Sequence, residues 1–396
     1  MSEFMIDVFK LADLFVTHAI QSHGNEVGII AYYGSYALGE ATPRSDLDLI
    51  FIPDEGKASS LAACFVLDGI SFDFFPISWQ RAERLANGSN GWAVGPSLIA
   101  TAKLLYARSE ADRQRFEALQ ARVDDLQSPA HRPQMAQRAL DHFKVAVFHL
   151  GNLRLALVEG DFSSIRKAAW QVVMAAVECL ALVNQRYFQR GWDANLAEIL
   201  QLQQRPAELE AWISTLATAD DVHQIAEAAE SLVAATRAIL RREQSLPGTE
   251  KGVGKGVASV FGDYYPELHD KVNKIVTRCE NGNQVGASWA AMFIQDEVTR
   301  FIASAQGEAN DESFNLYHEY AKHYRQLHLP ELMRFTGGED AQKLAAQALH
   351  FDRGMQEWLT QFSVPLNTIS DFDSFVQFLQ IRYRQQQNSP QLTISA

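Results

Sequence analysis

The stretch of sequence that decides the fold is YYGSYALGEATPRSDLDLIFI, residues 32–52. It starts inside one apolar run rich in β-branched and aromatic residues, Val27–Tyr33, and ends with a second, Asp46–Ile52. Runs of this length and composition, bounded by turn residues, predict β-strands. Gly34-Ser35 follows the first run directly, so we expect the chain to turn there into a short helix before it enters the second strand.

A pair of aspartates, Asp46 and Asp48, opens the second predicted strand. Strand alternation places both carboxylates on one face, about 7 Å apart at the backbone. Two such charges repel unless a cation lies between them, and Mg²⁺ prefers oxygen ligands of this kind. A third acid, Asp73, lies among phenylalanines in the alternating run Ile70–Ile77, where a charge is costly unless it is paired or bound to metal. If these strands are neighbours, three carboxylates converge and can hold two metal ions for an in-line displacement.

The Gly34-Ser35 turn supplies the other half of a nucleotide site. Glycine lets the backbone approach a phosphate closely, and the following amides and hydroxyl can donate to its oxygens. The alternative interpretation of Gly34-Ser35 and the aspartate pair is a plain turn followed by a strand with an exposed acidic start. The alternative for Asp73 is an ion pair with Arg44 or Arg81. Ser45 either takes part in the site or only starts the strand and bonds a neighbouring amide.

These residues resemble a known signature, G-S-x-x-x-G-x-A-x-x-x-S-D-x-D, of the DNA polymerase β-like nucleotidyltransferase superfamily. The matching positions are Gly34, Ser35, Gly39, Ala41, Ser45, Asp46 and Asp48. The match covers roughly the first 110 residues and looks most like the minimal and the antibiotic nucleotidyltransferases. Asp73 fits the family's third carboxylate, which stands on a later strand.

The resemblance implies an α/β nucleotidyltransferase domain, in which helices flank a mixed sheet, followed by mainly α-helical bundle domains. It also implies Mg²⁺-dependent binding of a nucleoside triphosphate and transfer of a nucleotidyl group with release of pyrophosphate. By position, Gly34, Ser35 and Ser45 would bind the triphosphate. Asp46, Asp48 and Asp73 would be both the metal ligands and the catalytic acids, and the third carboxylate can also help to deprotonate the acceptor.

The hydrophobic pattern divides the chain into three parts. Residues 1–110 are mixed α/β, with a helix expected at 4–20 and a further strand at 103–107. Residues 111–245 have a helical period and form the expected acceptor-binding bundle. Helices are expected there at 134–158, 163–190, 194–203, 207–217 and 220–242. A Gly- and Lys-rich boundary at 246–257 precedes a C-terminal helical domain of unknown role, 258–385, and a frayed tail.

The composition limits the class of protein. Of 396 residues, 47% are hydrophobic, which excludes a disordered chain, and 35 basic against 48 acidic residues give a net charge of −13. Such a charge argues against a protein that coats duplex DNA or an anionic membrane. Three widely spaced cysteines exclude a disulfide framework and fit a reducing compartment. We see neither a signal peptide nor a membrane span, and expect a cytoplasmic location.

Glu178 is the candidate acceptor-side base, because it interrupts a long apolar helix. If it faces a cleft, burial would raise the pKa of its carboxyl towards neutrality. The favoured alternative is a glutamate on the helix surface or in a salt bridge. Asn184, Arg186 and Tyr187 are weaker candidates for the same cleft.

The function hypothesis is transfer of an NMP group, with ATP as the expected donor and Mg²⁺ as cofactor, to a hydroxyl of a small molecule. The acceptor would bind between the catalytic and helical domains, and an antibiotic is one candidate; an acidic cleft would suit a cationic one. An alternative acceptor is a protein or tRNA, as in antitoxin-like enzymes. A second alternative is a nucleotide-sensing module without turnover. The oligomeric state stays open.

Overall fold

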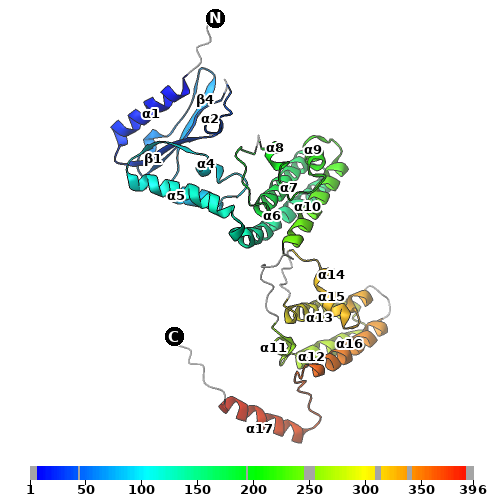
Figure 1. Cartoon of the computed structure of the whole chain (residues 1–396). Helices are drawn as coiled ribbons and strands as arrows, with labels where there is room; N and C mark the ends of the chain where they lie inside the picture. The colour runs from blue at the N-terminus through cyan, green and yellow to red at the C-terminus, as the bar shows by residue number, and fades with distance from the viewer. Residues whose placement is uncertain are drawn as a thin grey trace. The chain divides into compact units, whose positions relative to one another are not determined.

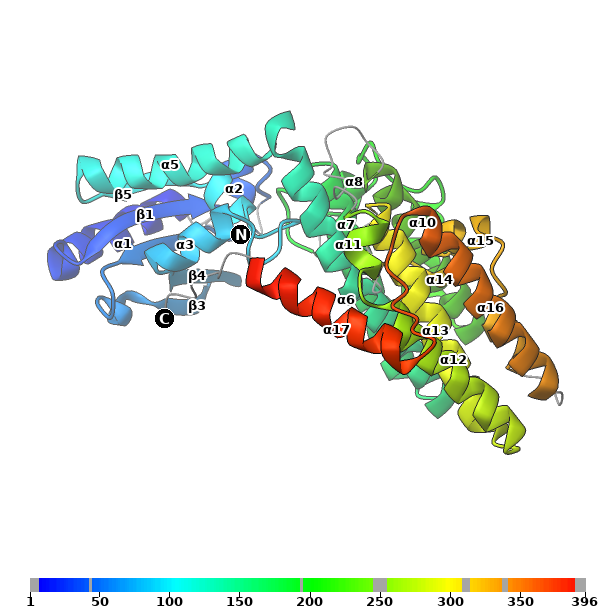
Figure 2. The ribbon, with the colours of Figure 1, turned by 90° about the horizontal axis from the view of Figure 1, so that it is seen from below.

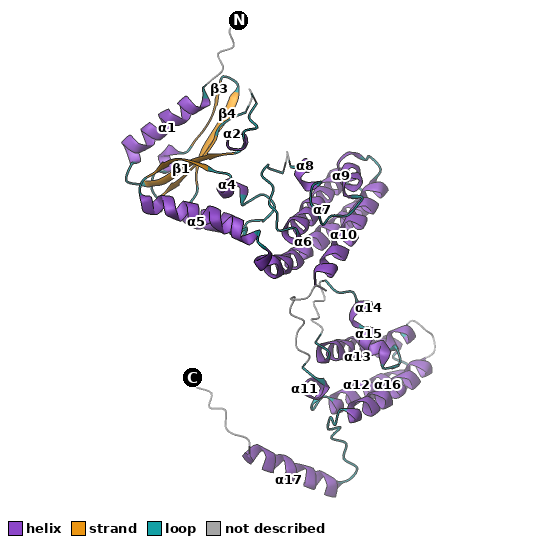
Figure 3. Cartoon of the chain, in the orientation of Figure 1, coloured by secondary structure: helices purple, strands orange, loops and turns teal. Residues whose placement is uncertain are grey.

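The computed structural model of the protein describes residues 7–42, 45–192, 195–244, 255–307, 314–336 and 341–388. The chain forms two compact units, Met1–Thr249 and Glu250–Ala396, and each is described by itself (Figure 1). The first unit contains a five-stranded sheet followed by helices, and the second is helical (Figure 3). This is the predicted fold class. The predicted boundary at 246–257 and the predicted tail lie largely outside the described residues.

The sheet of the first unit is mixed. Its strands are β1 (Val27–Tyr33), β2 (Asp48–Pro53), β3 (Ala63–Leu67), β4 (Ile70–Pro76) and β5 (Lys103–Ala107), in the spatial order β3-β4-β2-β1-β5. The pair β2–β4 is parallel, and the other neighbours are antiparallel. Four strands agree with the sequence prediction within two residues at each end. The edge strand β3 was not predicted, because its side chains are half or fully exposed and give no clear alternation.

Helices flank the sheet. They are α1 (Val8–His23), α2 (Ser35–Leu38), α3 (Trp79–Ala86), α4 (Ser97–Ala100) and α5 (Glu110–Leu126). Helix α1 packs its buried residues against Leu47, Leu49, Phe72 and Phe74 on one face of the sheet. Helix α5 lies against β1 and β5 on the other side (Figure 1). Strand alternation therefore sends the side chains of residues 46, 48 and 73 to the face opposite α1.

A helical bundle completes the first unit. It consists of α6 (Arg132–Glu159), α7 (Phe162–Val183), α8 (Leu196–Ile199), α9 (Leu209–Thr218) and α10 (Val222–Gln244). Figure 2 shows the chain passing from α5 into α6 at the start of this bundle. Helices α6, α7 and α10 pack against one another, and α7 is buried along most of its length. The prediction that α7 runs to residue 190 was wrong. Asn184 caps the helix, and Gln185 follows with a φ of +51°, a left-handed conformation that ends it.

The second unit is built from helices. Its elements are α11 (Val257–Phe261), α12 (Tyr265–Glu280), α13 (Gln284–Ala305), α14 (Tyr317–Tyr320), α15 (Lys322–Gln326), α16 (Ala341–Gln361) and α17 (Phe372–Asn388), with a 3₁₀ turn at Leu332–Phe335. One hydrophobic core joins α12, α13 and α16. In the described part of both units, no helix is long and apolar enough to cross a membrane.

Candidate active site

Three neighbouring strands carry polar side chains to one face of the sheet. Tyr33 pairs with Asp48 in the antiparallel β1–β2 register. In the parallel β2–β4 register Leu49 pairs with Phe74, and the residues one position earlier are Asp48 and Asp73. Because paired residues share a face, Tyr33, Asp48 and Asp73 lie in a row across the sheet. The prediction that the strand with Asp73 lies beside the strand with Asp48 is therefore confirmed.

Gly34 lies against this row at the end of β1. Its φ of +73° and ψ of −153° form a backbone conformation that glycine adopts and L side chains avoid. A β-carbon at this position would also lie 2.6 Å from Oδ2 of Asp48. The predicted turn into a short helix is present, with Ser35 as the first residue of α2. The phosphate-cradle glycine and the metal-binding acid of the sequence hypothesis are thus adjacent in space.

The carboxylates of this face interact electrostatically with one another. Burial, and then the charges of Asp46 and Asp73, raise the pKa of Asp48 to about 6. Burial and the charge of Asp73 raise the pKa of Asp46, against a backbone hydrogen bond that lowers it. The pKa of Tyr33 is raised by burial and by all three carboxylates, while Arg81 opposes the shift. The face is a site of concentrated negative charge that a cation would relieve.

The environment of Asp73 differs from the sequence argument. That argument placed the carboxylate among phenylalanines at a desolvation cost, but Asp73 is exposed and Phe72 and Phe74 face the other way, into the core. No ion pair joins Asp73 to Arg81 in the described structure, and Arg44 lies outside the described residues. The electrostatic coupling to Asp46 and Asp48, and not burial, is what marks Asp73 as part of this face.

The donor set of this face fits a hard divalent cation. It consists of carboxylate oxygens, which Mg²⁺ prefers to nitrogen or sulfur ligands. Within the described ranges, no three His, Cys, Asp or Glu side chains are already arranged around a common metal position. The residues present are therefore suitable in chemistry and charge, and the roles of Asp46, Asp48 and Asp73 as metal ligands stay a prediction.

Ser45 has a local partner. Its Oγ accepts a hydrogen bond from the backbone amide of Thr42 at 2.9 Å and lies 3.2 Å from the Thr42 hydroxyl. This bond closes the turn before Asp46, as the second of the two interpretations of Ser45 proposed. A role of Ser45 in nucleotide binding stays a prediction.

Glu178 links the helical bundle to the α/β part of the unit. The side chain is buried, and its two oxygens accept hydrogen bonds from the backbone amides of Trp92 at 2.5 Å and Ala93 at 2.9 Å. The favoured interpretation, a surface or salt-bridged glutamate, was therefore wrong. Both oxygens are engaged by amides, which indicates a structural role, and the role as a base stays a prediction.

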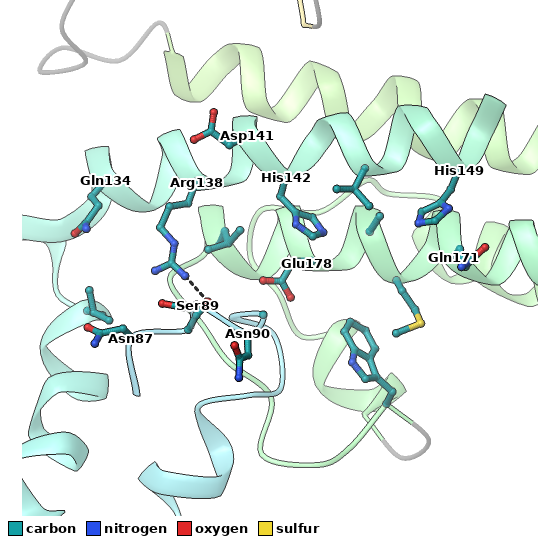
Figure 4. A pocket seen from close by; sticks show the side chains of 18 of the residues that line it. Asn87, Ser89, Asn90, Gln134, Arg138, Asp141, His142, His149, Gln171 and Glu178 are labelled. Carbon is teal, nitrogen blue, oxygen red and sulfur yellow. Dashed lines mark hydrogen bonds between the residues drawn. The ribbon is translucent and has the colours of Figure 1, made fainter. Parts of the chain in front are cut away.

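Glu178 also lines a pocket of about 910 Å³ (Figure 4), called the α6–α7 pocket below. The pocket lies between α6 and α7, and the segment 87–91 that follows α3 closes one end. The sequence expectation that Asn184, Arg186 and Tyr187 share this cleft was wrong. They line a different pocket, of about 970 Å³, together with Glu40.

The sequence argument did not name Tyr33, and it named Arg81 only as an alternative ion-pair partner of Asp73. Tyr33 and Arg81 frame the acidic face through Phe75, whose ring lies 6.1 Å from that of Tyr33 and 6.0 Å from the Arg81 guanidinium carbon. Alternation along Val27–Tyr33 could have placed Tyr33, but Arg81 stands on a separate helix. The turn sequence Asn-Gly-Ser-Asn-Gly at 87–91 was a readable signal for a loop near a site.

A strand, a Gly-Ser turn into a short helix, and acids on two adjacent strands of a mixed sheet are the features that the sequence resemblance to nucleotidyltransferases predicts. Comparison with protein families is consistent with this class. Residues 113–244, from α5 to the end of α10, match the family described as the KNTase C-terminal domain. This match covers part of the chain, and it supports an assignment to the nucleotidyltransferase superfamily and nucleotidyl transfer as the general activity.

Comparisons with solved structures and with curated proteins add little to this assignment. Among solved structures, the chain is similar to a nucleotidyltransferase-like protein from Exiguobacterium sibiricum, with a TM-score of 0.38 and 8% sequence identity. The alignment covers 59% of this chain and 78% of that protein. Comparison with curated proteins found no significant match.

Proposed function

We propose that the protein transfers an NMP group from a nucleoside triphosphate, with ATP as the expected donor, to a hydroxyl of a small-molecule acceptor. Pyrophosphate is the leaving group. The observation that carries this proposal is the contact between Gly34 and Asp48, which joins a turn suited to phosphate and a coupled set of three carboxylates in one place. The family match on the helical domain supports the same reaction class.

Each part of the site has a separate task in this proposal. The backbone of Gly34 and Ser35 lets the triphosphate approach the sheet edge without a side chain in the way. Asp46, Asp48 and Asp73 would hold Mg²⁺, which, when bound, offsets the charge of the triphosphate and of the leaving pyrophosphate. Asp73 is the most exposed of the three, so it is also the one best placed to accept a proton from an incoming hydroxyl.

Two rival functions are compatible with the same fold and differ in the acceptor or in whether the nucleotide is turned over. A protein or tRNA acceptor would use the same carboxylates, and a sensing module would bind nucleotide without turnover. The coupled set of three acids favours turnover over sensing, because loss of one carboxylate is the simplest way to abolish catalysis.

The test is incubation of the full chain with α-labelled ATP, Mg²⁺ and separate panels of small hydroxylated molecules, aminoglycosides, lincosamides, tRNA and host proteins. Label on a small molecule supports the proposal, and label on a macromolecule supports the first rival. Tight nucleotide binding without transfer in any panel supports the second rival. The control is Asp48→Asn, which should fold like the unchanged chain and transfer no label.

A further inference from the structure

We propose that the α6–α7 pocket binds a hydroxyl-rich small molecule that is neutral or anionic, and that it does not bind polycations. The claim that this ligand is the acceptor of nucleotidyl transfer rests on the proposed function above. The claim that the pocket binds it does not. The inference starts from the side chains that two helices send into the pocket. Helix α6 contributes Arg138, His142, Val145 and His149, and α7 contributes Gln171, Met174, Ala175, Glu178 and Leu182.

Three of the four α6 residues are polar, and Val145 lies between the two histidines. On α6 they recur at intervals of four, three and four residues, so they share one face of the helix. Figure 4 shows the imidazoles of His142 and His149 directed from α6 towards the side chains of α7. The ligand would therefore lie along the groove, with polar groups on its α6 side and a mainly apolar floor formed by Met174, Ala175 and Leu182.

The acids that line the pocket are poorly placed to receive ammonium groups. Glu178 already accepts two backbone N–H donors, one at each oxygen. Asp141 is exposed, and its carboxylate is directed away from His142 and Glu178 (Figure 4). A polycation needs several uncommitted carboxylates to replace its lost hydration, and burial of an unpaired charge is costly. The pocket therefore disfavours the aminoglycoside type of acceptor.

The histidines provide neutral hydrogen-bonding groups instead. Burial lowers the pKa of His142, although the nearby Glu178 charge opposes this, and burial also lowers the pKa of His149. A neutral imidazole offers one donor and one acceptor, which matches a hydroxyl group. The Nδ1 atom of His149 is buried and has no hydrogen-bond partner among the described residues. Buried polar atoms are rarely left unpaired, so this atom indicates where a ligand hydroxyl would bind.

Arg138 fixes a positive charge at the end of the groove near the 87–91 turn. Its guanidinium donates to the carbonyl oxygen of Gly88 at 2.6 Å and lies 5.9 Å from the centre of the Trp92 ring. A guanidinium held in this way keeps further N–H groups for a carboxylate or phosphate. This arrangement extends the class of ligand from neutral to anionic molecules.

Helix α3 connects this pocket with the acidic face. Arg81, near its start, interacts with Tyr33 beside the carboxylates, and Asn87, at its end, lines the pocket. Six residues of helix separate them, which corresponds to about 9 Å along the axis. The pocket and the carboxylates therefore stand at opposite ends of one short helix.

The test is isothermal titration of the full chain, without nucleotide or Mg²⁺, with glucose 6-phosphate, ribose 5-phosphate, myo-inositol and the polycation kanamycin. We expect saturable binding of at least one hydroxylated probe and none of kanamycin. His149→Gln and Arg138→Gln should weaken that binding at least tenfold. His223→Gln, an exposed histidine on α10, is the matched control and should leave it unchanged.

Three results would overturn the inference: kanamycin binding that competes with the sugars, no saturable binding of any hydroxylated probe, or binding that both pocket variants retain. His149→Gln keeps the size and polarity of the side chain, so it remains informative if Arg138→Gln does not fold. A separate titration with ATP and Mg²⁺ distinguishes the two proposals. If the unchanged chain binds a hydroxylated probe but does not bind ATP with Mg²⁺, the proposed function is overturned and the pocket assignment stands.

Discussion

Oδ2 of Asp48 lies 2.6 Å from the point that a β-carbon on residue 34 would occupy, so Gly34 and Asp48 share one space in the fold. The turn that follows β1 and the acid that opens β2 are consequently not independent features. A change at either position moves the other. This coupling explains in physical terms why a Gly-Ser turn and an Asp-x-Asp strand occur together in the sequence.

Replacement of Gly34 by alanine should therefore remove activity by displacing the Asp48 carboxylate. We expect nucleotidyl transfer to fall about 100-fold or more, because a displacement of about 1 Å at a reacting centre has effects of that size. The positive φ combined with an extended ψ, a region essentially restricted to glycine, should cost about 1–3 kcal/mol of unfolding free energy as well. Steady-state transfer of label and urea unfolding measure the two effects.

Gly39→Ala is the matched control for this variant. Gly39 has a φ of +75°, close to that of Gly34, but a β-carbon there meets nothing within 4 Å. Gly39 has a ψ of +23°, in the left-handed helical region, whereas Gly34 has a ψ of −153°, so Gly39→Ala should lose less stability. Gly34→Ala alone should lose transfer. Equal activity of the two variants would show that the contact with Asp48 does not matter for catalysis.

The pH dependence of stability should report the raised pKa of Asp48. Its pKa of about 6 in the folded chain exceeds the value of about 3.9 expected when unfolded. The stability contributed by the protonated carboxyl is fully present below about pH 4 and is lost as pH rises through about 6. Asp48→Asn carries no such charge, so its melting temperature should exceed that of the unchanged chain at pH 8, and the difference should vanish near pH 4.

Asp13→Asn, on the exposed side of α1, is the control for the loss of one carboxylate. Thermal unfolding in matched buffers without divalent ions is the measurement. A melting temperature of Asp48→Asn that stays below that of the unchanged chain at pH 8 would contradict the assigned electrostatics.

Added Mg²⁺ should stabilise the unchanged chain more at pH 8 than at pH 5. Protons and the metal compete for the same carboxylates, and a ligand at 100 times its Kd contributes about 2.7 kcal/mol of stability. We expect a rise in melting temperature that EDTA reverses and that Asp48→Asn and Asp73→Asn both lack. An equal Mg²⁺ effect in these variants would place the metal elsewhere.

The sequence was sufficient to predict which side chains form the acidic face, because the patterns that indicate them lie within short segments. Alternation in residues 46–52 and 70–77 fixes which side chains share a face, and the family signature fixes the turn. Only the relative order of the strands needed a guess, and the parallel β2–β4 pairing confirmed it. Asp73 was assigned partly for the wrong reason, since a strand pattern does not say which of its two faces is covered by a helix.

The α6–α7 pocket could not be predicted in the same way. It depends on contacts between residues far apart in the chain, such as Glu178 with the amides of Trp92 and Ala93. Helical period indicates that Glu178 interrupts an apolar surface, but not that backbone amides from another element will meet it. The end of α7 at Val183 was missed for a related reason, because the side chain of Asn184 binds the carbonyl oxygen of Gln204.

Replacement of Glu178 by glutamine distinguishes its structural role from the role of a base. The glutamine amide group can accept at only one atom, so one of the two backbone N–H groups would lose its partner, at a cost of about 1–3 kcal/mol in unfolding free energy. Because both oxygens are already occupied, we expect the transfer rate of folded enzyme at low temperature to change only a few-fold. Glu227→Gln, an exposed glutamate on α10, should change stability by less than about 0.5 kcal/mol.

The two roles predict opposite combinations of results. Loss of a general base lowers the rate about 10²- to 10⁴-fold even when the protein is fully folded. A Glu178→Gln protein that melts like the unchanged chain but transfers nucleotide at such a reduced rate would restore Glu178 as the base. A protein that melts earlier and keeps its rate per folded molecule would establish Glu178 as the residue that holds the 92–93 segment against α7. The proton of the acceptor hydroxyl would then have to go to a carboxylate on the acidic face. Asp73 would be the first of these residues to mutate.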